Sequence, residues 1–126
     1  KFGPTTSIPF PEGDFCPETP YTVIKENLAR GLHTLVLLDL RPVEKRFMSV
    51  NDGLRYLLGL ESKRNEKVIN ESTLAIGCAR MGIDSLIKSG KIKRLLVENF
   101  GAPLHCIIIP GKLHFMEEEA VKEFSV

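Results

Sequence analysis

Apolar residues along the chain alternate between short uninterrupted runs and runs with helical spacing. The mainly apolar segments lie at residues 33–40, 73–80 and 105–110, with uninterrupted apolar runs at 35–38 and 107–109, and a shorter segment lies at 5–10. Apolar runs of four to eight residues bounded by turn residues are typical of strands. The run at 33–40 shows no polar alternation, which predicts a strand covered on both faces of a sheet.

The segments after these runs carry helix signals. Thr19 and Pro20 predict an N-cap followed by proline at the first helical position, and Gly31 predicts the end of that helix. Ser49, followed three residues later by Asp52, predicts a capping box with aspartate in place of the usual glutamate. Helices are therefore expected in the segment 21–30, after Ser49 through the leucine stripe Leu54, Leu57, Leu58 and Leu60, at 90–100 with Ile92, Leu95 and Leu96 inward, and at 113–124.

The alternation of strands and helices predicts one α/β domain with a mostly covered sheet. A chain of 126 residues suits a single compact domain with a real core. Residues 41–47 and 62–72 are rich in charge and are expected to be connections, and residues 78–86 are expected to lead from a strand into a loop.

The overall composition excludes some partners. Apolar residues make up 43%, charged residues 26%, and the formal net charge is +1. Phosphate-binding surfaces normally show a basic excess, so no nucleic-acid partner is expected. The apolar runs are too short to span a bilayer, and the N-terminus does not resemble a signal peptide, so no membrane association is expected. The first residue is not methionine, and we expect the chain to be part of a longer protein.

The cysteines indicate a reducing compartment. Cys16, Cys78 and Cys106 are odd in number and far apart, and no CxxC pair occurs. This pattern predicts a cytoplasmic protein without a structural zinc site. Cys78 and Cys106 lie inside apolar runs, where a free cysteine usually behaves as a small hydrophobic residue.

The chain lacks the common motifs for phosphate binding (Walker A and GxGxxG), for zinc binding (HExxH) and for a nucleophilic serine (GxSxG). His33 is expected to bond a nearby backbone carbonyl, and His114 is expected to be structural at the start of the last helix. The consecutive glutamates 117–119 fan around that helix rather than converging on a metal. They are expected to form a solvated face that suits the helix dipole.

Two polar residues at strand ends, Asp39 and His105, are each consistent with either ligand binding or a structural role. Asp39 closes the apolar run 33–40, and ligands of open α/β sheets commonly bind outside strand ends. A cap or bridge to a neighbouring group is equally consistent with its position. His105 precedes the last apolar run and is placed either to bond a ligand or to hold a loop.

Four blocks of the sequence resemble successive blocks of the diphthine synthases, methyltransferases of the tetrapyrrole-methylase-like class. They are PEGDFCPETPYTVIKENLARGLHTLVLLDL (11–40), FMSVNDGLRYLL (47–58), TLAIGCARMG (73–82) and FGAPLHCIIIPGKLHFMEEE (100–119). They occur in the family's order and spacing, and the resemblance extends from about Lys1 to Glu119. The combination of YTVIKENLARGLHTL with PLHCIIIPGKLHFME is specific to this family.

The resemblance implies an activity and its partners. Diphthine synthases use S-adenosylmethionine, which becomes S-adenosylhomocysteine, to methylate the amino group of a modified histidine on translation elongation factor 2 during diphthamide synthesis. The family's cofactor lies in a cleft between two α/β domains, and the enzyme is typically a homodimer. Residues 1–126 match only the C-terminal domain, without the N-terminal cofactor-binding domain. We therefore expect the isolated chain to be inactive.

The resemblance also implies a set of cofactor-binding residues, and no residue is assigned as catalytic or as a metal ligand. Asp39 and Arg80 are adjacent to members of the set and are carried over less directly. For the strand ends at residues 38 and 79 to share one pocket with the start of the strand at 105, that strand must run antiparallel to the other two. A mixed sheet flanked by helices is therefore expected, with a cofactor site formed by Leu38, Ala79, Pro103, Leu104 and His105.

Two other functions remain open on the sequence. One is a methylase acting on a corrin or porphyrin precursor, against which the blocks GLHTL and PLH…PGKLHFME argue. The other is a non-catalytic α/β module that binds proteins. The length of the native protein separates the enzyme from the module, because an intact partner domain would restore a complete methyltransferase.

Overall fold

A five-stranded mixed sheet forms the centre of the protein, for which the computed structural model describes all residues from Lys1 to Val126. The first two strands in space are parallel, and every other neighbouring pair is antiparallel. The predicted antiparallel direction of the strand at 105–109 is therefore confirmed. The spatial order is β1 (Thr6–Ile8), β2 (Thr34–Leu38), β7 (His105–Ile109), β5 (Leu74–Ala79) and β6 (Leu86–Lys91).

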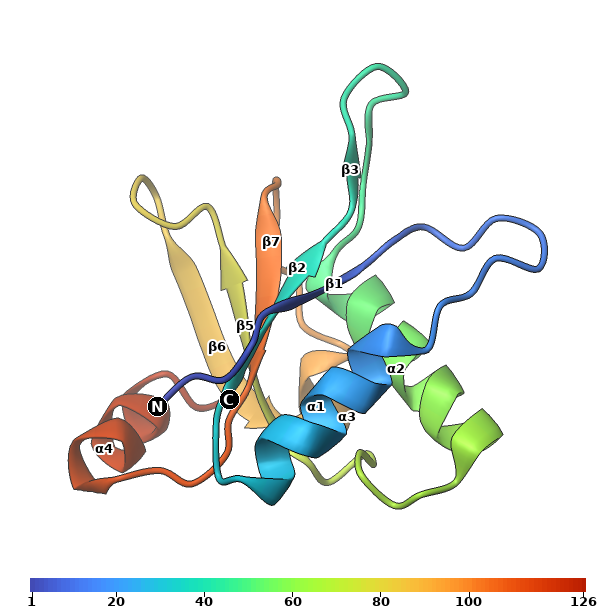
Figure 1. Ribbon diagram of the computed structural model, residues 1–126. Coiled ribbons are helices and arrows are strands. Elements are labelled where there is room, and N and C mark those ends of the chain that lie inside the picture. Colours follow the sequence, from blue (N-terminus) through green and yellow to red (C-terminus); the bar gives the residue numbers. More distant parts are fainter.

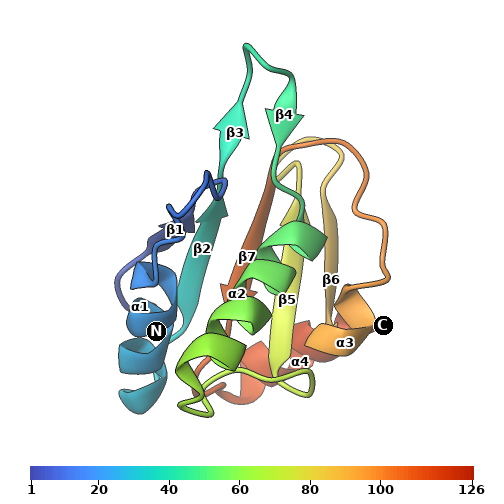
Figure 2. The same ribbon diagram turned by 90° about the vertical axis from the view of Figure 1, so that its right-hand side faces the viewer.

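The helices are distributed unequally over the two faces of the sheet. Figure 2 shows α1 (Thr19–Ala29), α2 (Val50–Arg64) and the short α3 (Ile92–Leu95) in front of the strands. The last helix, α4 (Phe115–Glu123), lies behind the sheet near its lower end. The main core forms between the sheet and the first two helices, where Val36, Ile107, Ile24, Leu54 and Leu57 are fully buried.

Helix α2 lies very close to the sheet because Gly53 has no side chain. A Cβ atom at this position would lie 2.7 Å from Leu38 Cδ2 and 2.8 Å from Ile107 Cδ1. The predicted capping box begins this helix: Ser49 Oγ accepts a bond from the Asp52 N–H at 3.1 Å, and the Ser49 N–H donates to Asp52 Oδ2 at 3.3 Å. The helix therefore starts at a defined point beside the end of β2 and the start of β7.

The opposite face of the sheet is only partly covered, and the prediction of a doubly covered strand at 33–40 is wrong. Leu37 is 47% exposed, and Leu35 is half-buried. Helix α4 covers this face only toward its lower end, where Ala120 and Val121 line a small cavity with Ile108. Residues 35–38 are continuously apolar even though one face of β2 is exposed to solvent, so the sequence pattern did not reveal the uncovered face.

Two further elements differ from the sequence interpretation. The segment 86–91 forms strand β6, although its residues Ser89 and Gly90 favour no strand, because it pairs with β5 along its whole length. The predicted helix at 90–100 is therefore reduced to α3, although Ile92 and Leu95 are buried as expected. The supposed connection at 41–47 belongs to a projecting hairpin of β3 (Leu40–Arg41) and β4 (Arg46–Phe47) (Figure 1).

Helix α4 is held to the sheet by a histidine and a glutamate. His33 is buried, its Nδ1 accepts from the Gly111 N–H at 2.9 Å, and its Nε2 lies 2.8 Å from Glu117 Oε2. The predicted carbonyl partner of His33 and the predicted solvated role of Glu117 are both wrong. Bonds from the His114 N–H and from His33 lower the pKa of Glu117 to about 2. His114, as predicted, is structural and is the N-cap of α4.

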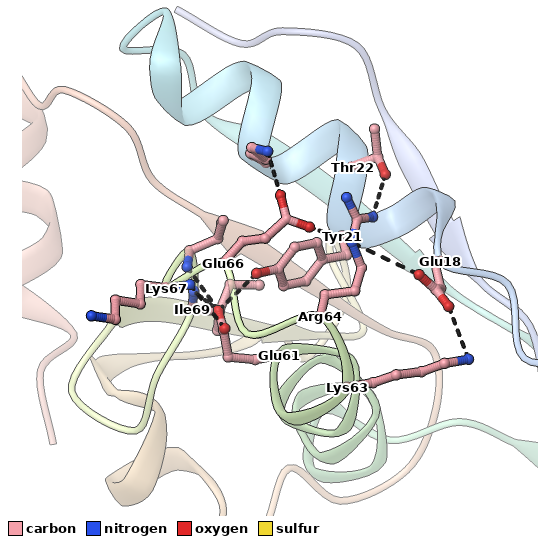
Figure 3. Close-up of polar contacts among 11 residues, drawn as sticks. Glu18, Tyr21, Thr22, Glu61, Lys63, Arg64, Glu66, Lys67 and Ile69 are labelled. Carbon is pink, nitrogen blue, oxygen red and sulfur yellow. Dashed lines mark hydrogen bonds and ion pairs between the residues drawn. The ribbon is translucent and has the colours of Figure 1, made fainter.

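A carboxylate organises the junction between α1 and the end of α2 (Figure 3). Glu61 Oε1 accepts from the Val68 N–H at 2.7 Å, the Ile69 N–H at 2.8 Å and the Tyr21 hydroxyl at 3.0 Å. Its Oε2 accepts from the Lys67 N–H at 3.0 Å. Burial opposes ionisation of Glu61, but these hydrogen bonds outweigh it and lower its pKa. One side chain therefore fixes the path of the chain toward β5.

Candidate functional site

An apolar cleft opens at the end of the sheet where β2 and β5 end and β7 begins. Its volume is about 690 Å³. The antiparallel register, in which Leu37 is opposite Cys106 and Ala79 is opposite His105, brings these strand ends together. The residues that line the cleft are Leu37, Leu38, Leu40, Arg80, Met81, Ile83, Pro103, Leu104, His105 and Cys106.

Arg80 holds the loop 100–104 that forms one wall of the cleft. Its Nη1 donates to Phe100 O at 2.7 Å and to Ala102 O at 2.6 Å, and its own N–H donates to Leu104 O at 2.8 Å. The guanidinium is thus bonded to the backbone of the loop. Its function in this structure is to shape the wall.

His105 holds the same loop from the other side. It is 7% exposed, and its Nδ1 accepts a bond from the Val50 N–H in the first turn of α2 at 3.2 Å. Its Nε2 lies 3.1 Å from both Gly101 O and Ala102 O, so it carries the proton and donates. Both ring nitrogens therefore have backbone partners, and His105 joins the loop to helix α2.

The predicted site residues largely come together. Leu38, Pro103, Leu104 and His105 all line the cleft, and Leu104 is 58% exposed there. Ala79 does not line it; this fully buried residue lies opposite His105 on the neighbouring strand. Whether these residues contact a cofactor stays a prediction.

Of the two less direct candidates, Arg80 lines the cleft, whereas Asp39 closes the end of the sheet. Asp39 Oδ2 accepts from the Phe10 N–H at 2.9 Å, and its Oδ1 accepts from the Leu40 N–H at 2.8 Å. The capping interpretation of Asp39 is thus the one that the structure supports.

Sequence reasoning missed five apolar or thiol-bearing residues of the cleft. They follow or alternate with the predicted ones along the strands, and their proximity to Leu38 and Arg80 was the available signal. They are Leu37, Leu40, Met81, Ile83 and Cys106. Met81, Ile83 and Leu104 are all well exposed, so the edge of the cleft presents apolar side chains to solvent.

The lining of the cleft is suited to binding an apolar ligand. The residues that line it include no carboxylate, and no group of three histidine, cysteine or acidic residues in the chain is placed to hold a metal ion. Apolar walls with a few ordered polar groups are typical of pockets for small organic ligands. No helix in the structure combines the length and apolar character that crossing a membrane requires.

The neutral state of His105 makes the loop sensitive to pH. Burial lowers the pKa of His105 below its usual value of 6.5, although the carbonyls of Ala102 and Gly101 act in the opposite direction. Since the unfolded chain takes up this proton more readily, the contribution of neutral His105 to the free energy of unfolding is complete above about pH 6.5 and is lost as the pH falls below that value.

As the pH is lowered from 6.5, we expect the urea concentration at half-unfolding to decrease less steeply in His105→Asn than in the wild type. Equal slopes would show that His105 does not contribute.

Solved structures establish the class of the fold. The crystal structure of a protein assigned as a diphthine synthase from Entamoeba histolytica superimposes with a TM-score of 0.93 at 36% identity, over 99% of this chain and 51% of that one. A second diphthine synthase structure gives a TM-score of 0.80 at 30% identity, over 98% of this chain and 45% of that one. The protein therefore has the methylase-like α/β fold.

Sequence relatives identify the family. The diphthine synthase of Methanocaldococcus jannaschii is 62% identical over 125 residues, which are 97% of this chain and 49% of the relative. That of Methanococcus maripaludis strain C7 is 58% identical over 123 residues, 97% of this chain and 48% of the relative. No family model matches the chain. The chain belongs to the diphthine synthase family, and it spans about half the length of the curated relatives it matches.

Proposed function

We propose that the chain is the C-terminal half of an S-adenosylmethionine-dependent diphthine synthase and that the apolar cleft holds part of the cofactor. The observation that carries this proposal is the convergence of Leu38, Pro103, Leu104 and His105 on one cleft. These residues come from two segments that are 65 positions apart in the chain, the end of β2 and the loop that leads into β7. The high identity to diphthine synthases supports the same conclusion.

The residues of the cleft fit an adenosine-containing cofactor. A volume of about 690 Å³ lies within the range of small-molecule sites, and Leu38 and Leu104 supply apolar walls. The loop 100–104 is fixed by Arg80 and His105 before any ligand arrives. A preorganised loop loses little conformational entropy on binding, which favours affinity.

The cofactor, when bound, supplies an activated methyl group, so the chemical difficulty lies in the cofactor itself. This chain's residues would bind and orient it, and Leu37, Leu40 and Met81 would exclude water from one side. Positioning of this kind supplies a large part of the rate enhancement in group transfer. Since the chain spans only about half the length of its relatives and would form one side of the cofactor site, it is expected to be inactive alone.

The similarity to diphthine synthases also suggests the partners of the complete enzyme. The protein substrate would be the modified histidine of translation elongation factor 2, in the cytoplasm, and the complete enzyme would be a homodimer. The remaining half of the protein would close the cleft over the exposed Leu104 and Ile83. The rival function, a protein-binding module without catalysis, draws on the same exposed apolar residues.

Calorimetric titration with S-adenosylhomocysteine tests the proposal. We expect no measurable binding to the chain alone, and binding once the complementary half of a diphthine synthase is added. Leu104→Asp should weaken binding in that mixture at least about tenfold, which corresponds to 1.4 kcal/mol. Val97→Asp is the matched control, because Val97 is also exposed, at 81%, and does not line the cleft.

The outcomes separate the two functions. Absence of binding with both halves folded would reject the cofactor site and favour the protein-binding module. Methyl transfer by a preparation of the chain that is free of the other half would contradict the expected inactivity.

A further inference from the structure

Cys78 and Cys106 lie directly opposite each other on the antiparallel strands β5 and β7. Opposite residues in such a pair have Cα atoms about 4.5 to 5.5 Å apart, and their side chains project from the same face of the sheet. Disulfides form across Cα separations of about 4.4 to 6.8 Å. The backbone therefore already places the two thiols at a separation that a covalent bridge can span.

The two thiols share a surface that reagents can reach. Both line an apolar hollow of about 480 Å³ on the uncovered face of the sheet, together with Leu35, Met81 and Ile108. Cys106 is half-buried and also lines the cleft, whereas Cys78 is only 3% exposed. A small reagent therefore meets Cys106 first.

The two thiols also differ in acidity, and this difference again favours reaction at Cys106. The neighbouring Cys78 thiol lowers the pKa of Cys106 to about 7 even though burial opposes ionisation. The interaction with Cys106, together with burial, raises the pKa of Cys78. The thiolate is the nucleophile in disulfide exchange, so Cys106 is the attacking group of the two.

We propose that Cys78 and Cys106 form a modification site for low-molecular-weight disulfides, at which Cys106 reacts first and Cys78 resolves the product. The Cys106 sulfur attacks one sulfur of the reagent, whose S–S bond breaks and releases one thiol, which takes up the proton of Cys106. Cys78 then loses its proton and attacks the Cys106 sulfur, and the second thiol leaves. The two protein thiols are oxidised to one disulfide, and one reagent disulfide is reduced to two thiols.

The modification has a consequence for the cleft. A mixed disulfide on Cys106 places the reagent group among Leu37, Met81 and Leu104, and therefore inside the cleft. The reaction itself does not depend on which ligand the cleft binds. The site and the proposed function can thus fail or succeed separately.

Peptide mapping after incubation with glutathione disulfide tests the site on the 126-residue chain. We expect wild-type protein to yield a disulfide-linked pair of peptides that contain residues 78 and 106. Cys78→Ala should stop the reaction at the mixed disulfide and leave glutathione on Cys106. Cys106→Ala should leave Cys78 unmodified. Cys16→Ala is the control that should retain the linked pair, since Cys16 is exposed and lines neither the hollow nor the cleft.

The wild-type measurement needs no substitution and is independent of any folding defect in a variant. Modification confined to Cys16 in the wild type would overturn the proposal. Equal modification of Cys78 in the presence and absence of Cys106 would also overturn it. All three cysteine-to-alanine variants should retain the wild-type circular dichroism spectrum, because alanine replaces a small side chain in each.

Discussion

Replacing Glu61 with alanine is expected to lower the free energy of unfolding by about 4 kcal/mol, since hydrogen bonds to a charged group contribute roughly 1.5–3 kcal/mol each. The substitution leaves the N–H groups of Lys67, Val68 and Ile69 and the Tyr21 hydroxyl without their acceptor. Tyr21 and Ile69 are fully buried, so water cannot replace the carboxylate at both sites. Urea denaturation of wild type and variant measures the difference.

Glu66→Ala is the matched control for this result. Glu66 lies in the same cluster and pairs with Lys25 and Arg64, but these are partly exposed ion pairs. Exposed pairs contribute about 1 kcal/mol or less, so this variant should stay close to wild type. Equal losses in the two variants would show that Glu61 has no special role at the junction in Figure 3.

The pH dependence of the Glu61 contribution follows from its lowered pKa. A carboxyl whose pKa is lower in the folded protein stabilises the fold above its unfolded pKa, near 4.5 here, and this contribution is lost as the pH falls. The wild type should therefore lose stability in acid relative to Glu61→Ala, which lacks this carboxyl. The difference in stability between wild type and Glu61→Ala should shrink as the pH falls below about 4.5.

Replacing His105 with alanine is expected to lower the free energy of unfolding by about 3 kcal/mol, because a buried polar group left unpaired costs about 1–3 kcal/mol. The Val50 N–H loses its acceptor, and the carbonyls of Gly101 and Ala102 lose a donor. The ring also packs edge-on against Phe47 and Phe100, and alanine leaves a cavity there. Thermal and urea denaturation measure this loss.

A second measurement separates the loop from general stability. In the mixture of both halves, His105→Ala should weaken S-adenosylhomocysteine binding at least about tenfold, and His105→Asn should recover part of it because its side-chain oxygen can accept from Val50. His114→Ala is the control, since His114 is exposed at the N-cap of α4. Unchanged binding in a folded His105→Ala variant would contradict a positioning role for His105.

Local signals predicted much of the fold. The apolar runs around Val36 and Ile107 became strands, and the Ser49–Asp52 pair became a capping box, because both depend on neighbours in the chain. The antiparallel direction of β7 followed from requiring three strand ends to share one pocket. Strand β6 was missed because Ser89 and Gly90 owe their conformation to pairing with β5 rather than to their own preferences.

Part of the candidate site was also accessible from the sequence. Leu38, Leu104 and His105 were correctly placed near one another, but the sequence interpretation left open whether His105 binds a ligand or holds a loop. Its hydrogen-bond partners lie on α2, 55 residues away, and in the adjoining loop. A side chain's partners across such separations depend on packing, which the order of residues does not reveal.

The sequence by itself determined the family, through the resemblance of its four blocks to the diphthine synthases. It also determined the α/β class and the approximate positions of most strands and helices, because these rest on periodicity and caps. Only the tertiary structure decided which face of the sheet stays uncovered, that Ala79 is buried beside the cleft, and that Cys78 is opposite Cys106. The physical reason is that strand register and helix placement arise from contacts between distant segments. The same apolar sequence is compatible with a covered or an uncovered face until those contacts form.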